Sequence, residues 1–294
     1  MLIDCHVHAA RRASIPRKNG TCYPTADEMV AKLDEVGIDK AVVMCGISPE
    51  CRSQFVPPED VLDLCASHPE RLIPCCNVDP RCDSNSPDAD FSRFFEYYRN
   101  AGCRGVGEVT ANLAFDDPLV WNLFRYCQEY KMPVTFHIAP RFGGCYGLVD
   151  DLGLPRLERT LKEFPDLVFL GHSQPFWAEI GGDVTDETRG GYPKGKVAPG
   201  GRVVELMERH DNLHGDLSAG SGCNAVSRDP AFGYQFMERF QDRLLFGTDI
   251  TYVELEPPLP AYLKEAVEDG RISPEAYEKI AWRNADRVFK LELA

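Results

Sequence analysis

The sequence predicts a closed barrel of eight parallel β-strands with helices between them, the (β/α)8 fold, in a single domain covering residues 1–294. Eight short runs are apolar almost throughout, as expected of parallel strands buried on both faces, and helical patterns separate them. An open doubly wound sheet is the alternative, but the first run is not followed by the GxGxxG pattern of dinucleotide-binding open sheets. The expected strands are residues 2–6, 40–45, 72–78, 103–109, 133–138, 167–172, 212–217 and 244–249.

Residues 26–36 carry the clearest helical signal. Met29 and Leu33 share one face, Thr25 and Glu28 form a capping box before the first turn, and Gly37 follows as the stop. Prolines introduce two later helices, because proline suits the first helical position. The other expected helices are residues 59–67, 88–100, 118–131, 156–164, 201–210, 230–240, 259–268 and 274–289.

Two connecting segments are too long and polar to be minimal loops: residues 9–24, after the first strand, and residues 173–200, after the sixth. Both follow the C-terminal ends of strands. In a (β/α)8 barrel those ends form the catalytic face. We therefore expect both segments to lie over the active site and to influence which substrate it accepts.

Charge and composition restrict the function classes. Lys and Arg number 32 against 46 Asp and Glu, for a net charge of −14, which disfavours binding to nucleic acid or to an anionic membrane. No apolar run of about 18 residues is present for a membrane span. Asp4 and His6 occupy the place where a signal peptide would have its apolar core.

Twelve cysteines are present, none of them in a CxxC pattern, so zinc-ribbon, thioredoxin-like and iron–sulfur sites lack their spacing. Cys45, Cys75, Cys76 and Cys103 fall inside apolar runs, where a reduced thiol behaves as a small hydrophobe. We therefore expect a cytoplasmic protein with reduced thiols.

The positions of the histidines predict a metal centre. Four of the seven stand at C-terminal ends of expected strands: His6 and His8 on the first, His137 on the fifth and His172 on the sixth. Side chains two apart on a strand share a face, so His6 and His8 can chelate one ion. The barrel brings all of these strand ends to one mouth.

Two carboxylates complete the expected ligand set. Asp249 ends the eighth strand, which neighbours the first strand in a closed barrel, so we expect it beside His6 and His8 as a ligand and proton acceptor. Glu108 ends the fourth strand, where a buried acid needs a cationic partner, either a metal or an arginine.

Three further residues are expected to contact the substrate. Arg141 follows His137 and suits a substrate carboxylate, while Trp177 lies in the second long segment and Asp216 ends the seventh strand. Solvated, loop-anchoring and structural roles remain open for Arg141, Trp177 and Asp216 respectively.

With these residues assembled, the chain resembles the amidohydrolase superfamily, in particular the amidohydrolase-related branch that includes aminocarboxymuconate semialdehyde decarboxylase. The resemblance covers nearly the whole chain and rests on IDCHVH, FHIAP, LGHSQPFW, LLFGTDI and KIAWRNADRVFKL, in that order. It implies one metal held by His6, His8, His137 and Asp249, with His172 near the substrate as an acid–base or orienting group.

Glu108 departs from the pattern of the decarboxylase-like members. Its GxGE context resembles TatD-type metal hydrolases, which bind two metals. In that arrangement Glu108 bridges an ion on His6, His8 and Asp249 and a second ion on His137 and His172. Zinc is the first expectation, with manganese, iron and cobalt also suited to histidine and carboxylate ligands.

Two reactions on a small-molecule substrate follow from this centre. The main hypothesis is hydrolysis of an ester, lactone or amide by metal-activated water, with Asp249 as the base. The alternative is non-oxidative decarboxylation of an aromatic or unsaturated acid, with Arg141 on a carboxylate. A non-catalytic metal-binding barrel is disfavoured by the completeness of the ligand set. The expected assembly is a monomer or a homodimer.

Overall fold

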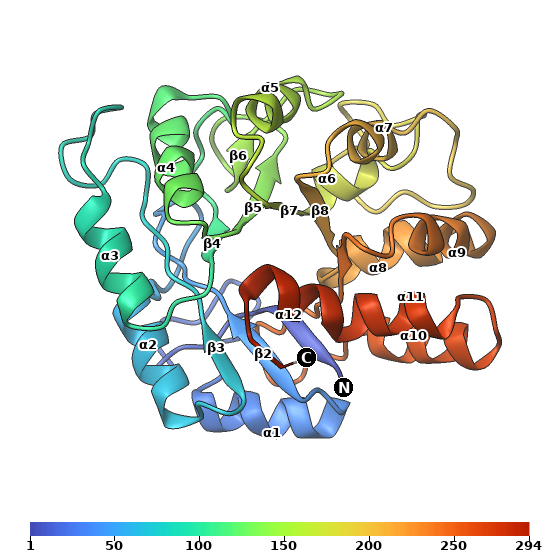
Figure 1. Ribbon diagram of the computed structural model, residues 1–294, viewed down its shortest axis with the longest axis horizontal. Coiled ribbons are helices and arrows are strands. Elements are labelled where there is room, and N and C mark those ends of the chain that lie inside the picture. Colours follow the sequence, from blue (N-terminus) through green and yellow to red (C-terminus); the bar gives the residue numbers. More distant parts are fainter. Residues whose placement is uncertain (294) are drawn as a thin grey trace.

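The computed structural model describes residues 1–293, and its strands form the ring that the apolar runs predict (Figure 1). Eight parallel strands make the barrel, and β6 (Leu148–Val149) is a short addition paired with β5. The barrel strands are β1 (Ile3–Val7), β2 (Lys40–Val43), β3 (Leu72–Pro74), β4 (Val106–Val109), β5 (Val134–Ala139), β7 (Phe169–His172), β8 (Leu213–Asp216) and β9 (Leu244–Leu245).

Hydrogen bonds at two seams close the ring. The continuous ladders are β1-β2-β3 and β4-β5-β7-β8-β9. Between β3 and β4, the Cys76 N–H donates to the Gly105 carbonyl at 3.0 Å. Between β9 and β1, the Cys5 N–H donates to the Phe246 carbonyl and the His8 N–H to the Ile250 carbonyl, each at 2.9 Å. The prediction of a closed barrel is therefore confirmed.

Helices surround the strands, and their caps are those that the sequence supplies (Figure 1). The Thr25–Glu28 capping box forms as predicted, and Gly37 ends α1 in the left-handed conformation, with φ 83°. The helices are α1 (Ala26–Val36), α2 (Pro58–Ser67), α3 (Ser92–Asn100), α4 (Pro118–Glu129), α5 (Pro155–Glu163), α6 (Gln174–Ala178), α7 (Arg202–Arg209), α8 (Ala219–Ser227), α9 (Pro230–Arg239), α10 (Leu259–Glu268), α11 (Pro274–Glu278), a π-helical turn (Lys279–Arg283) and α12 (Asn284–Phe289).

The C-terminal helix α12 closes the N-terminal end of the barrel. Val288 and Phe289 pack in one buried cluster with Ile3, Ile73 and Leu170 from the barrel strands. In Figure 1, α12 lies across the centre of the ring, and the N-terminus is drawn near it. The opposite end, at the C-termini of the strands, holds the polar residues described below.

The structure differs from the predicted elements in several segments. Strand β6 was not predicted, the helix expected at residues 88–100 begins only at Ser92, and the helix expected at residues 274–289 contains a π-helical turn. Residues 173–200 begin with the short helix α6 rather than with loop, because the Ser173 side chain caps the Phe176 N–H and Pro175 occupies the first turn. Helix α8 was not predicted, since its sequence AGSGCNAVS is poor in residues that favour helices. Residues 9–24 contain neither helix nor strand, as expected.

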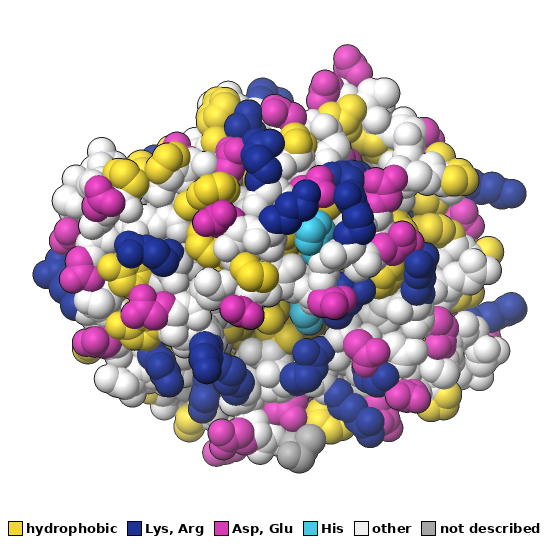
Figure 2. Space-filling model, turned by 45° about the horizontal axis from the view of Figure 1, so that its top comes forward, with side chains coloured by type: hydrophobic (Ala, Val, Ile, Leu, Met, Phe, Trp, Pro, Cys, Tyr) yellow, Lys and Arg dark blue, Asp and Glu magenta, His cyan; other side chains and the backbone are white. Residues whose placement is uncertain are grey.

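Within residues 1–293, no helix is long and apolar enough to cross a membrane. All twelve cysteines are free, and the four that fall in apolar runs are buried. On the face drawn in Figure 2, basic and acidic side chains lie next to one another. Among the ion pairs of the described residues, Glu158 contacts Lys162, Arg202 and Arg209.

Candidate metal centre

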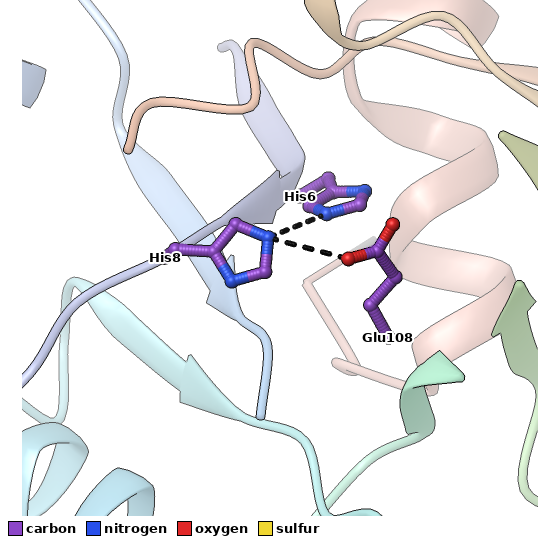
Figure 3. A group of neighbouring side chains, drawn as sticks. All are labelled: His6, His8 and Glu108. Carbon is purple, nitrogen blue, oxygen red and sulfur yellow. Dashed lines mark hydrogen bonds and ion pairs between the residues drawn. The ribbon is translucent and has the colours of Figure 1, made fainter. Parts of the chain in front are cut away.

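The C-terminal ends of the strands bring the predicted ligands together, although they are spread from residue 6 to residue 249 of the sequence. His8 is the hub of the group. Its Nε2 lies 3.1 Å from His6 Nε2, 3.5 Å from Asp249 Oδ1 and 3.7 Å from Glu108 Oε2. Figure 3 shows the His6 and His8 rings turned toward each other, with the Glu108 carboxylate facing His8.

Asp249 reaches this group through an unusual backbone conformation. It follows β9 with φ 57°, in the left-handed region that aspartate tolerates better than most residues. Its backbone N–H donates to the His6 carbonyl at 2.9 Å, and its carboxylate oxygen Oδ1 lies 3.9 Å from His6 Nε2. A quarter of its side chain remains exposed, so the carboxylate faces both the histidines and the open mouth.

Glu108, His137 and His172 form a second group on the other side of the mouth. One ligand atom from each lies within 4.8 Å of the others. Glu108 Oε1 is 3.9 Å from His172 Nε2, while its other oxygen, Oε2, faces His8. Glu108 therefore stands between the two groups with one oxygen directed to each.

Asp216 lies behind the histidines rather than in the open mouth. Its fully buried Oδ2 is 2.7 Å from His6 Nδ1 and 3.5 Å from His172 Nδ1. The Trp177 indole N–H donates to the Asp216 carbonyl at 2.8 Å. The Asp216 carboxylate therefore contacts the Nδ1 side of the His6 and His172 rings, which leaves their Nε2 atoms facing the mouth.

Burial and neighbouring charge set the protonation of these groups. Burial alone would lower the pKa of His6, but the adjacent Asp216 carboxylate outweighs burial and raises it to about 10. Burial lowers the pKa of His8 and of His137, and lowers that of His172 to about 3, so these rings are neutral. Burial raises the pKa of Asp249 to about 7.

The residues present fit a divalent cation. Two atoms bound to one ion at about 2.0–2.2 Å lie roughly 3 to 3.5 Å apart, close to the 3.1 Å and 3.5 Å separations around His8. The Nδ1 of His137 is buried without a hydrogen-bond partner. No Lys or Arg nitrogen lies within ion-pair distance of Glu108 among the described residues, so a bound cation would supply this buried carboxylate with a directly contacting positive charge.

A cavity of about 140 Å³ opens onto this group, and one of its walls is cationic. Arg17 and Arg52 line it together with Tyr23, whose ring stacks on His8 with centroids 5.6 Å apart. The Arg17 guanidinium lies 4.7 Å from the centre of the Tyr23 ring, and Arg52 NH1 donates to the Tyr23 hydroxyl at 3.4 Å. Across the described residues, neither arginine forms an ion pair with a carboxylate. The Arg17 guanidinium donates to the Thr21 hydroxyl and the Thr251 carbonyl, and that of Arg52 to the Ser48 carbonyl and the Thr110 hydroxyl.

Sequence reasoning did not identify this wall. Arg17 and Tyr23 lie in the long segment 9–24, and Arg52 lies in the loop after β2. The sequence of such loops has no periodic pattern from which their conformation could be predicted. The useful signal was the position of segment 9–24 directly after the HxH strand.

The three expected substrate contacts do not line this cavity. Trp177 is buried in α6, with its only polar atom bonded to Asp216, and Asp216 is fully buried. Arg141 is exposed and lines a neighbouring hollow that shares His137 and Tyr146 with the main cavity. These surroundings are closer to the alternative roles: loop-anchoring for Trp177, structural for Asp216 and solvated for Arg141.

The comparisons with known proteins agree with this geometry. A family model described as amidohydrolase matches residues 3–291. The chain belongs to the amidohydrolase family. The resemblance inferred from the sequence is confirmed, and this amidohydrolase is a metal-dependent enzyme. Among curated proteins, none has a sequence that matches it.

Solved structures with the same barrel cover almost all of the chain. An uncharacterized TIM-barrel protein from Bordetella bronchiseptica is 20% identical, with a TM-score of 0.64, over 98% of both chains. A dihydroxybenzoic acid decarboxylase from a Polaromonas species, with bound manganese and 2-nitroresorcinol, is 16% identical, with a TM-score of 0.63, over 100% of this chain and 98% of its own. A probable 2-pyrone-4,6-dicarboxylic acid hydrolase from Acinetobacter baumannii is 15% identical, with a TM-score of 0.60, over 98% of this chain and 99% of its own. At these identities the likeness shows the fold.

Proposed function

We propose that this amidohydrolase removes CO2, without oxidation, from a small aromatic or unsaturated carboxylic acid. The observation that carries the proposal is the cationic wall, in which Arg17 and Arg52 face the metal ligands without carboxylate partners of their own. In a chain with 46 acidic residues, two partly buried arginines left without ion pairs are suited to an anionic ligand. The dihydroxybenzoic acid decarboxylase with the same fold supports this choice.

The reaction assigns distinct tasks to the residues of the cavity. The bound cation would polarise a substrate oxygen as a Lewis acid. Arg17 and Arg52 hold a carboxylate beside the metal ligands, and Tyr23 keeps the two guanidinium groups in place. When the bond to the departing CO2 breaks, its electron pair stays on the substrate carbon, which then takes a proton. Asp249 is suited to deliver that proton, because its pKa of about 7 allows exchange near neutral pH.

Hydrolysis is the second candidate, and Asp249 is suited to this reaction as well. A carboxylate whose pKa is about 7 can also accept a proton from an attacking water. The Acinetobacter neighbour is named as a hydrolase of a dicarboxylic acid, so an anionic substrate is compatible with either reaction. The fate of water distinguishes them, since hydrolysis adds a solvent oxygen to the product and decarboxylation adds only hydrogen.

We also propose that the centre would hold two cations, with Glu108 as a ligand to both, His6 and His8 on one side and His137 and His172 on the other. The support is the position of its carboxylate, with one oxygen 3.7 Å from His8 Nε2 and the other 3.9 Å from His172 Nε2. Zinc and manganese both suit this ligand set. Elemental analysis should give two ions per chain in the wild type and about one in Glu108→Gln. A single ion in both would leave the one-metal arrangement.

The reaction is tested in 18O-labelled water on a panel that joins hydroxybenzoic and unsaturated dicarboxylic acids with lactones and esters that carry a carboxylate. Release of CO2 with unlabelled product supports decarboxylation, whereas 18O in the product without CO2 release supports hydrolysis and rejects the main proposal. Asp249→Asn should abolish turnover while retaining metal, and unchanged turnover would remove Asp249 as the proton donor or acceptor.

The anionic substrate is tested with Arg52→Met. Loss of a charge-assisted hydrogen bond, about 1.5–3 kcal/mol, should raise KM or lower kcat/KM by about 10- to 100-fold. Arg141→Met is the matched control, because it removes the same charge outside the cavity. Equal losses in both variants would point to a general charge effect rather than to a binding wall.

A further inference from the structure

One buried carboxylate contacts two histidines of the metal centre from behind. Asp216 Oδ2 lies 2.7 Å from His6 Nδ1 and 3.5 Å from His172 Nδ1, and the two ring centroids are only 4.6 Å apart. Because the nitrogens that face Asp216 are the outer ones, both Nε2 atoms face the cavity side. His6 serves one group of candidate ligands and His172 the other.

Ser218 completes the contact to His172. Its hydroxyl lies 3.0 Å from His172 Nδ1, and its backbone N–H donates to Asp216 Oδ1 at 2.9 Å. Ser218 is fully buried, so its hydroxyl does not exchange partners with bulk water. His172 Nδ1 is therefore adjacent to one hydroxyl and one carboxylate.

Asp216 is itself held from several directions. Its Oδ1 also accepts from the Cys5 thiol at 3.3 Å, and its backbone carbonyl accepts from the Trp177 indole. Gly247 makes room for the arrangement, because a Cβ at that position would lie 3.1 Å from Asp216 Oδ1 and 2.8 Å from the Ser218 Cβ. Gly247, two residues after β9, thus leaves room for the Asp216 side chain at the end of β8 to reach His6 on β1.

We propose that Asp216 and Ser218 are positioning residues that fix one tautomer of His172 and one orientation of His6. An ionised carboxylate accepts hydrogen bonds and cannot donate them, so it favours a proton on each facing Nδ1. His172 then presents a bare Nε2 to the cavity, as a metal ligand or proton acceptor. Asp216 links the two halves of the centre, whereas Ser218 acts on His172 alone.

The inference rests on the proposed metal centre and not on which reaction it catalyses. Its readouts are therefore made without substrate, and they keep their meaning if the decarboxylase proposal fails. The first readout is the tautomer of His172 in metal-free protein, taken from long-range ¹H–¹⁵N correlation of its ring nitrogens. The wild type should show hydrogen on Nδ1, and hydrogen on Nε2 would overturn the proposal.

The second readout is zinc affinity in chelator-buffered solution at pH 9, where protons compete for His6 less than they do at pH 7. Asp216→Asn should lose about 10- to 100-fold in affinity, the usual effect of removing an outer partner of a ligating histidine. Ser218→Ala should lose less affinity than Asp216→Asn, because Ser218 contacts His172 but not His6, yet it should show a mixture of His172 tautomers. Wild-type affinity in Asp216→Asn, or an unchanged single tautomer in Ser218→Ala, would overturn the corresponding half of the proposal.

Asp150→Asn is the matched control for loss of a buried carboxylate. Asp150 is fully buried and accepts three backbone N–H groups, from Asp151, Arg156 and Leu157, but contacts no histidine. This variant should lose stability while keeping the tautomer and the zinc affinity.

If Asp216→Asn fails to fold, Gly247→Ala tests the same contact by pushing the carboxylate away from His6. Its zinc affinity should also fall, and wild-type affinity would count against the proposal.

Discussion

Protons and metal ions should compete for one nitrogen of His6, which makes metal affinity steeply dependent on pH. The Asp216 carboxylate raises the pKa of His6 to about 10, so both ring nitrogens carry hydrogen in the metal-free protein at neutral pH. A cation on Nε2 has to displace one of these protons. At pH 7 the displacement costs about 4 kcal/mol, from three pH units at about 1.36 kcal/mol each. Affinity should therefore rise about tenfold per pH unit between pH 7 and 9.

The proton on His6 also affects the stability of the metal-free protein. This stability changes with pH in the opposite direction to metal affinity. A histidine whose pKa is raised on folding stabilises the protein fully below its unfolded pKa of about 6.5, and the contribution is lost as the pH rises through about 10. Stability of the metal-free protein should thus fall between pH 7 and 10, while metal affinity rises. Metal should consequently protect against denaturation more strongly at pH 9 than at pH 7.

Calorimetric zinc titration in two buffers of different ionisation enthalpy counts the protons released. About one proton per ion is expected at pH 8, and more below pH 7, where Asp249 also holds a proton. Zinc affinity from chelator competition supplies the slope independently. A flat affinity between pH 7 and 9 with no proton release would refute the reasoning, because it would show that His6 is already neutral.

Three further predictions concern stability and are measured by chemical denaturation of the metal-free protein. Gly171→Ala should destabilise by about 1–3 kcal/mol, since its Cβ would lie 2.3 Å from the buried Phe176 ring; a loss below about 0.5 kcal/mol would mean that the ring can move aside. Thr25→Ala should cost about 1 kcal/mol by removing the capping box of α1, with zinc affinity unchanged as the internal control. Trp177→Phe should cost about 1–3 kcal/mol, because the buried Asp216 carbonyl loses its 2.8 Å donor; a neutral result would show that the carbonyl finds another partner.

The parts of the fold that the sequence predicted are those governed by periodic burial. Every barrel strand falls at least partly within an apolar run, because a parallel strand buried on both faces needs apolar side chains on both. Helix α8 escaped prediction because its Gly and Ser residues carry no helical pattern, and tertiary packing holds it instead.

The candidate site likewise contains residues that the sequence could place and residues that it could not. Residues at strand ends, such as His8 and Asp249, could be placed from the sequence, because the barrel fixes where strand ends meet. Arg17 and Arg52 could not, since they depend on loop conformations. Asp216 was found as a strand-end acid, but its contact with His6 depends on the absence of a side chain at Gly247.

The seam between β9 and β1 bears on how this chain can be made. Ile3 to Val7 are synthesised before their partners on one side, which lie around Phe246 and Ile250 and are translated more than two hundred residues later. Until then one edge of β1 offers unpaired backbone groups, a form prone to aggregation. Helix α12, which closes the N-terminal end of the barrel, leaves the ribosome later still. The native barrel is therefore completed only after translation has passed α12, and chaperones that shield nascent edges should matter most for β1 and the strands that follow it.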